Sequence, residues 1–250
     1  MKSLKESIFS DVDDIASNDA VLIEQFLKDN YNIRGTYNID GNVVDVDGHA
    51  AVKNKYIKSL TNGVFRFRNV SGSFDCSYCS SLVSLEGAPK EMNGDFWCHN
   101  CEKLTSLEGA PKYIKGIFNC GSCDNLKSLE GAPEYVRGCF SCAHCKKLAS
   151  LEGSPEYARG IFNCGGCDNL KSLEGAPKEV GKSFSCAHCK KLASLKGAPE
   201  EVGASFYCNG CESLTSLKGA PKEVGGWFDC SNCGILKISV QDRKKYKIVT

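Results

Sequence analysis

The sequence is poor in net charge and in long apolar segments. Its 250 residues carry a formal net charge of only +1, whereas a dedicated nucleic-acid binder normally has a strong basic excess. No stretch approaches the roughly 20 apolar residues that a membrane-spanning helix needs. The start of the chain, Met1 to Phe9, shows no long apolar run and no small-residue cleavage site, so we expect no secretion signal. These features predict a soluble, cytoplasmic protein that binds neither nucleic acid nor membrane.

Proline is also scarce, and its positions are regular. All seven prolines follow Gly-Ala or, once, Gly153-Ser154, and they recur every 22 residues. The same period governs phenylalanine, each copy of which is followed two residues later by a Cys-x-x-Cys pair. The periodic phenylalanines are Phe74, Phe96, Phe118, Phe140, Phe162, Phe184, Phe206 and Phe228. Eight copies of one unit over residues 70–236 predict a stack of identical supersecondary structures.

Within one unit, the alternation of residues predicts a short strand. Phe184 and Cys186 point to one side of such a strand and the residues between and around them to the other. The Gly-Ala-Pro corner turns the chain and leaves little room for a helix on the return. We therefore expect a mainly-β repeat solenoid with one short parallel strand per 22-residue turn and with turns and extended segments on the return side.

Residues 1–69 do not follow the repeat. Asn18 or Asp19 can cap a helix from Ala20 to about Asn30, and the apolar spacing from Leu4 to Ile15 suggests a shorter helix before it. Asp40-Gly41, between two β-rich runs, predicts a hairpin turn. Because the end of a solenoid exposes its core, we interpret this α+β segment as an N-terminal cap; an independent small binding domain is the alternative.

The chain after the repeats, residues 237–250, is expected to close the other end. Leu236 to Val240 alternates like a closing strand, and the tail that follows is basic. Arg243, Lys244, Lys245 and Lys247 stand there against a single acid, Asp242. We interpret the tail as a solvated cap rather than a binding site for an acidic partner.

The repeat resembles leucine-rich repeats. The pattern Phe-x-Cys-x-x-Cys-x-x-Leu, as in Phe184 to Leu192, is similar to the later part of their core, Leu-x-x-Leu-x-Leu-x-x-(Asn/Cys)-x-x-Leu. In that core the first leucine lies three positions before the second, whereas here the corresponding apolar residue, Val180, lies four positions before Phe184. The motif Leu-x-Ser-Leu-Glu-Gly-Ala-Pro-Lys-Glu-Val resembles the repeats of short, uncharacterised repeat proteins of tailed phages and some bacteria. The resemblance implies a curved solenoid that serves as a binding scaffold, located in the host cytoplasm if it is phage-encoded.

Cysteine is abundant, and sixteen of the 17 residues form eight pairs; Cys139 is the odd one. Two neighbouring pairs match the template of a four-cysteine zinc site, the first set being Cys76, Cys79, Cys98 and Cys101. Each pair, however, occupies a place where the repeat needs a small inward residue, and free cysteine behaves as a small buried hydrophobe. We therefore predict a packed ladder of thiols without a cofactor, with metal ligation and disulfides as alternatives.

The outward side of the predicted strands is the candidate binding surface. It carries aromatic residues near both ends and an apolar strip in the middle, which is the composition of an interface core. The candidate residues are Asp75, Trp97, His99, Ile117, Asn119, Cys139, Ile161, Asn163, Tyr207, Trp227 and Asp229. The alternative interpretation is that they are sheet-forming residues tolerated at a surface.

No convergent set of titratable side chains suggests catalysis, so we expect a non-enzymatic protein. The leading hypothesis is a protein-interaction scaffold, encoded by a phage and engaging a host or virion protein of unknown identity. A structural spacer that self-associates is the first alternative, and a zinc-binding Cys-x-x-Cys array is the second.

Overall fold

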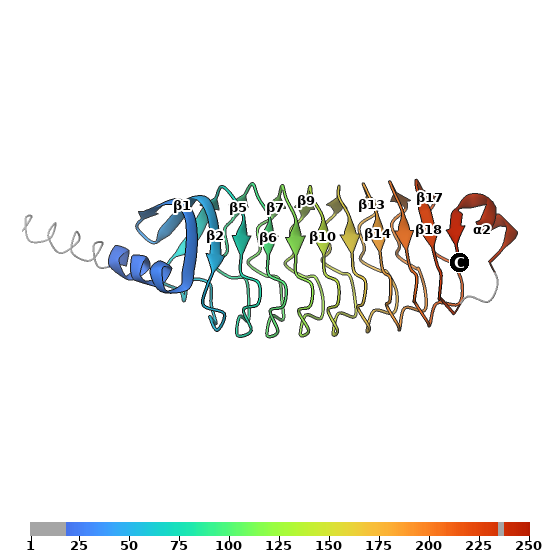
Figure 1. The fold of residues 1–250 in the computed structure, drawn as a ribbon, viewed down its shortest axis with the longest axis horizontal. Coiled ribbons are helices and arrows are strands. Elements are labelled where there is room, and N and C mark those ends of the chain that lie inside the picture. Colours follow the sequence, from blue (N-terminus) through green and yellow to red (C-terminus); the bar gives the residue numbers. More distant parts are fainter. Residues whose placement is uncertain (1–18, 235–237) are drawn as a thin grey trace, which may run out of the picture.

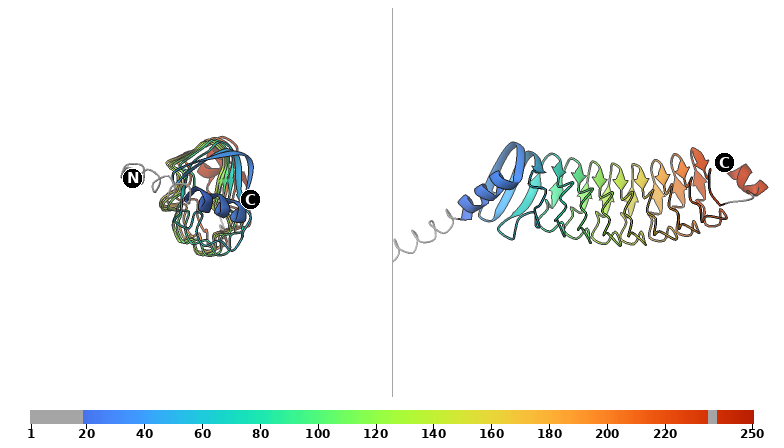
Figure 2. Two further views of the ribbon diagram at one scale, coloured as in Figure 1. Left: turned by 90° about the vertical axis from the view of Figure 1, so that its left-hand side faces the viewer. Right: turned by 60° about the horizontal axis from the view of Figure 1, so that its bottom comes forward.

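The chain folds into a parallel β-solenoid, as its period predicts. The computed structural model describes residues 19–234 and 238–250. About nine turns with a spacing of roughly 22 residues stack into a rod, with a small helix at the N-terminal end (Figure 1). Viewed along the rod, the turns nearly superimpose (Figure 2). None of the helices in the described residues is long and apolar enough to cross a membrane.

Each turn contributes two very short strands, which form two ladders side by side along the rod (Figure 1). The even ladder begins at each phenylalanine or one residue before it and contains β4 Phe74–Asp75, β6 Phe96–Trp97, β8 Phe118–Asn119, β10 Phe140–Ser141, β12 Phe162–Asn163, β14 Phe184–Ser185, β16 Phe206–Tyr207 and β18 Trp227–Asp229. The odd ladder contains β3 Arg66–Val70, β5 Glu91–Met92, β7 Tyr113–Ile114, β9 Tyr135–Val136, β11 Tyr157–Ala158, β13 Glu179–Val180, β15 Glu201–Val202 and β17 Glu223–Val224.

The odd ladder corrects the expectation of a single strand per turn. Val180 is buried and Glu179 is exposed, so this pair has its own inward and outward sides. The chain then bends over three residues before Phe184 starts the next strand, which explains the spacing of four between the two apolar positions. Equivalent residues of successive turns are in register, as in Val180↔Val202 and Phe184↔Phe206.

A stack of phenylalanine rings forms the centre of the core. The eight rings from Phe74 to Phe228 are fully buried, and successive rings lie 5.0–5.5 Å apart between centroids with 3–24° between their planes. The leucines of each turn are buried beside them. One continuous core therefore runs from Ile23 in the N-terminal helix to Tyr246 near the C-terminus.

The described part of the N-terminal segment packs on the end of the stack. The helix over residues 19–30 precedes a hairpin of β1, Tyr31–Asp40, and β2, Val43–Val52, in which Gly41 supplies the positive φ of 57°. Strand β2 pairs in parallel with both β3 and β4, so it acts as a first turn of the solenoid. Phe67 packs edge-on against Phe74, with centroids 5.4 Å apart, and so ends the series of parallel rings. The shorter helix suggested for residues 4–15 lies outside the described residues.

The C-terminal cap differs from the prediction. Val240 is not part of a closing strand but begins α2, Val240–Lys245, and the closing strand is β19, Lys247–Val249, which pairs with β18. The helix forms because the hydroxyl of Ser239 caps it by accepting a hydrogen bond from the backbone N–H of Asp242 at 3.0 Å. Tyr246 then covers Phe228, with centroids 4.7 Å apart. The basic tail thus forms a folded cap.

Candidate functional site

The predicted face, the outward side of the even ladder, ends in a pocket beside the hairpin. Asp75 and Trp97 line this pocket of about 360 Å³, which we call the N-terminal pocket. Arg34 and His49 enter it from β1 and β2, and the ring of His49 is held by a hydrogen bond from the backbone N–H of Ser73 to Nδ1 at 3.0 Å. The pocket therefore combines a guanidinium, an imidazole, a carboxylate and an indole, and its size suits one or two side chains of a partner.

His99 lies next to this region and contacts Tyr78. The two rings pack edge to face with centroids 5.1 Å apart. Within the described part of the chain, the buried Nδ1 of His99 has no hydrogen-bond partner. Burial lowers the pKa of His99, which favours its neutral form, while Asp75 acts in the opposite direction. The neutral form of this imidazole is therefore favoured, and its unpaired Nδ1 is buried beneath the surface rather than exposed to a ligand.

Tyr78 is a candidate that the sequence analysis missed. Its φ of 60° places it in the left-handed region, which is unfavourable for a bulky residue, and its side chain is 58% exposed. Other turns place Asn, Ser, His or Gly at the equivalent position, and a tyrosine there is the signal that would have identified it. Strained backbone at an exposed aromatic residue is a common feature of functional sites.

We expect Tyr78→Asn to raise the free energy of unfolding by about 0.5–1 kcal/mol, because asparagine tolerates the left-handed conformation. The reciprocal change, Asn100→Tyr, places a tyrosine on the same backbone (φ 57°) in the next turn and should lower stability by a similar amount. Urea unfolding monitored by circular dichroism would measure both. A loss of stability in Tyr78→Asn would show that the contact with His99 outweighs the backbone strain.

Four of the predicted polar residues accept hydrogen bonds from nearby backbone N–H groups. Side-chain oxygens accept the N–H group two residues later at 2.8–2.9 Å. These acceptors are Asp75, Asn119, Asn163 and Asp229. Each is half-buried, and its first role is to bend the chain at the end of the even-ladder strand.

The predicted apolar strip is present on the surface. Ile117 and Ile161 are 37% and 38% exposed, and Cys139, half-buried, lies between them. They are neighbours because Phe118, Phe140 and Phe162 pair in register. The strip begins on the turn after Trp97, although Trp97 itself pairs with Asn119 and Ile117 lies two positions before Asn119, so the pocket and the strip lie on neighbouring turns of the same face.

The remaining predicted residues lie at the other end. Tyr207 is half-buried, whereas Trp227 is 57% exposed and stands one position before its phenylalanine rather than one after it. Seven strand spacings, about 34 Å, separate the first turn from the last. The structure therefore divides the predicted face into an N-terminal group with the strip and a separate C-terminal group.

The paired cysteines are buried except Cys233, and they satisfy the backbone. The second thiol of each pair, from Cys101 to Cys233, donates to the carbonyl oxygen of the first cysteine in the preceding turn, at 3.0–3.3 Å. In a regular ladder the carbonyl of Cys98 would accept from the N–H of Gly121, but that N–H is bonded to Asn119. The thiol of Cys123 donates to the carbonyl of Cys98 in place of that N–H group, which explains why the second cysteine follows the first by three residues.

The four cysteines proposed as zinc ligands belong to this arrangement. Cys76, Cys79, Cys98 and Cys101 are buried, and the thiol of Cys101 donates to the carbonyl of Cys76 at 3.2 Å. In the part of the chain that the structure describes, no group of three or more His, Cys, Asp or Glu side chains is placed to hold a metal ion. The packed thiol ladder is the arrangement observed.

Comparisons with known proteins add no assignment. No protein-family model matches the chain, no curated protein matches it, and no solved structure matches it. The fold itself defines the class, a parallel β-solenoid built from 22-residue turns.

Proposed function

We propose that the protein is a non-enzymatic scaffold that binds a partner protein through the N-terminal pocket and the apolar strip of its even ladder. The observation that carries this proposal is that the two features share one face on neighbouring turns. A concave site with Trp97 and Arg34 lies one turn before the row formed by exposed Ile117, half-buried Cys139 and exposed Ile161. Tryptophan and arginine are the side chains most often found at the energetic centre of protein interfaces, and a flanking apolar row supplies buried area.

The partner chemistry follows from the lining. Trp97 offers an apolar surface for an aromatic or aliphatic anchor, and Arg34 offers a cation for an acidic or carbonyl group of the partner. An extended segment of the partner, lying along the rod, would reach from the pocket to Ile161 over four turns, which is about 14 Å. A phage-encoded role against a host or virion protein fits such a surface and rests on the resemblance of the repeats.

Binding should be lost in the double variant Trp97→Ala, Ile117→Ser, while the fold is retained because both side chains lie on the surface side. The measurement is a pull-down from lysate of the natural host under reducing conditions, followed by titration of the captured protein against each variant. We expect the affinity to fall at least about tenfold, since truncating one anchor residue typically costs more than 1 kcal/mol.

The matched control is Val21→Ser, Val83→Ser, which removes two exposed apolar side chains, 64% and 50% exposed, away from the pocket and the strip. It should bind as the unmodified protein does. Equal capture by all three proteins would place the binding surface elsewhere.

A further inference from the structure

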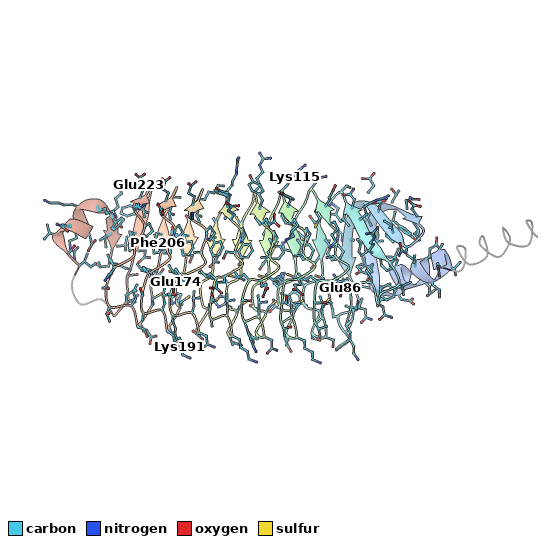
Figure 3. All side chains as sticks on the ribbon, turned by 180° about the vertical axis from the view of Figure 1, so that it is seen from behind. Glu86, Lys115, Glu174, Lys191, Phe206 and Glu223 are labelled. Carbon is cyan, nitrogen blue, oxygen red and sulfur yellow. The ribbon has the colours of Figure 1, made fainter. Side chains whose placement is uncertain are left out.

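Over its six strands from β7 to β17, the outward side of the odd ladder consists of two halves with opposite charge. In β7, β9 and β11 each strand starts with an outward tyrosine and is followed by a basic residue: Tyr113 with Lys115, Tyr135 with Arg137, and Tyr157 with Arg159, whereas the preceding strand β5 starts with Glu91 and lies outside the pattern. In the second half each strand starts with an outward glutamate and is followed by a glycine, as in Glu179 with Gly181, Glu201 with Gly203, and Glu223 with Gly225. The change occurs between β11 and β13. Lys115 and Glu223, one from each half, project from the same edge of the rod (Figure 3).

The outward glutamates of the acidic half form no ion pair within the part of the chain that the structure describes. Glu179, Glu201 and Glu223 are in register on adjacent strands about 4.8 Å apart, an arrangement in which like charges repel. Among the described residues none of the three forms an ion pair, and the nearby Lys222 binds Glu200 instead, at 2.5 Å. This row of carboxylates is therefore suited to cations supplied by another molecule.

The glycines of the acidic half open a groove of about 670 Å³. It runs from Tyr157 and Arg159 over the bare backbone of the glycines to Glu223. A Cβ atom on Gly203 would lie only 2.2 Å from the carbonyl oxygen of Gly181, so the close approach of the turns keeps this floor without side chains. The groove can receive long side chains that enter from outside.

The basic half presents side chains of that kind. Tyr113 is 64% exposed and Tyr157 is 45% exposed. The guanidinium of Arg159 lies over the ring of Tyr135, 5.8 Å from its centroid, so the aromatic and basic side chains form one surface, which also lines one end of the groove. Tyrosine and arginine are both enriched in the centres of interfaces.

We propose that the partner for this face is a second copy of the same chain, bound as an antiparallel homodimer. A two-fold axis that lies between β11 and β13 and runs along the strands reverses the order of the turns. It places β11 opposite β13 of the partner subunit, β9 opposite β15, and β7 opposite β17. All three basic turns then face acidic turns, and the tyrosine and basic side chains of each subunit lie over the glycine floor of the other. This inference is independent of the even-ladder site, because it uses a different face.

The size of the face sets the strength of the dimer. Six strands at about 4.8 Å, each with roughly 15 Å of side-chain width, give only about 430 Å² per subunit, roughly half of a standard interface. We therefore expect a reversible dimer with a dissociation constant in the micromolar range or weaker, which weakens further as salt screens its ion pairs.

Charge exchange at the middle pair tests the model. Each dimer contains two contacts between Arg137 of one subunit and Glu201 of the other. Arg137→Glu alone and Glu201→Arg alone should each weaken dimerisation of the full-length protein at least about tenfold, because each creates like-charge contacts. An equimolar mixture of the two variants should dimerise again, since a heterodimer restores both opposite-charge contacts. The double variant should also dimerise.

Sedimentation velocity over a concentration series up to about 1 mM, in reductant and at low ionic strength, measures these states. Circular dichroism confirms that each variant is folded, and the Trp97→Ala, Ile117→Ser variant should dimerise normally. A protein that stays monomeric throughout the series would overturn the proposal. So would single variants that associate like the unmodified chain, or a mixture that fails to recover.

Discussion

Raising the pH from about 8 to about 10.5 should unfold the solenoid cooperatively, because its thiols titrate only in the unfolded chain. Burial raises the pKa of the first cysteine in six of the pairs well above the ordinary value; these are Cys76, Cys98, Cys120, Cys142, Cys164 and Cys186. In the unfolded chain the same thiols lose their protons near pH 8.5–9. Their contribution to stability is thus complete below that pH and is lost as the pH rises toward the folded-state pKa.

The size of this effect exceeds that of any single substitution. Above pH 9, each thiol that is protonated in the folded state but ionised in the unfolded chain lowers the free energy of unfolding by about 1.4 kcal/mol per pH unit. Six such thiols lower it by about 8 kcal/mol per pH unit. A typical domain is stable by about 5–15 kcal/mol in total. Burial also raises the pKa of Cys79, to about 12, which adds to the same trend. The transition should therefore fall within about 1.5 pH units above 9.

Circular dichroism and the ultraviolet absorbance of thiolates, recorded on the same reduced sample, test this prediction. The loss of β-structure and the appearance of thiolates should follow one steep curve, and both should reverse when the pH is returned to 8. Thiolates that form gradually near their ordinary pKa, while the β-signal persists, would show that the cysteine pairs are open to solvent.

The repeated part of the fold was predictable because its signal recurs. Phe184 and Cys186 alternate in the way a strand requires, and eight copies fix the register that pairs Phe184 with Phe206. The odd ladder could not be recognised in the same way. A strand of two residues, such as Glu179–Val180, has too few positions to show alternation, and hydrogen bonds to the neighbouring turns define it.

The sequence of the C-terminal cap contains two conflicting patterns, one for a strand and one for the start of a helix. The alternation from Leu236 to Val240 favours a strand, whereas Ser239 followed three residues later by Asp242 is the pattern of a capped helix start. The structure follows the second pattern. The hydrogen bond from the backbone N–H of Asp242 to Ser239 starts the helix at Val240, while Ile238 packs against the core just before it.

The candidate site was only partly visible in the sequence. The outward placement of Asp75 and Trp97 follows from the phase of the strands. Arg34 and His49 could not be linked to them, because they reach the pocket from a hairpin that precedes the repeats and carries no periodic signal. Sequence periodicity thus locates a face, and the tertiary packing of the cap decides where that face becomes concave.

The second large effect is expected for Phe140→Ala, which should lower the free energy of unfolding by about 3–5 kcal/mol. Phe140 is fully buried and stacks on Phe118 and Phe162, with centroid distances of 5.4 and 5.1 Å. Neighbouring turns cannot close the gap, because hydrogen bonds between turns fix their spacing. Urea unfolding at constant pH and in reductant measures the change.

Because each turn of a solenoid contacts only its neighbours, this cavity also weakens the coupling between the two halves of the rod. The unfolding curve of Phe140→Ala should accordingly broaden or separate into two steps. Phe140→Leu retains most of the buried area and should lose only about 1–1.5 kcal/mol, while Ile161→Ser, on the surface of the next turn, should change stability by less than about 0.5 kcal/mol. Equal losses in all three variants would mean that the ring stack does not carry the coupling between turns.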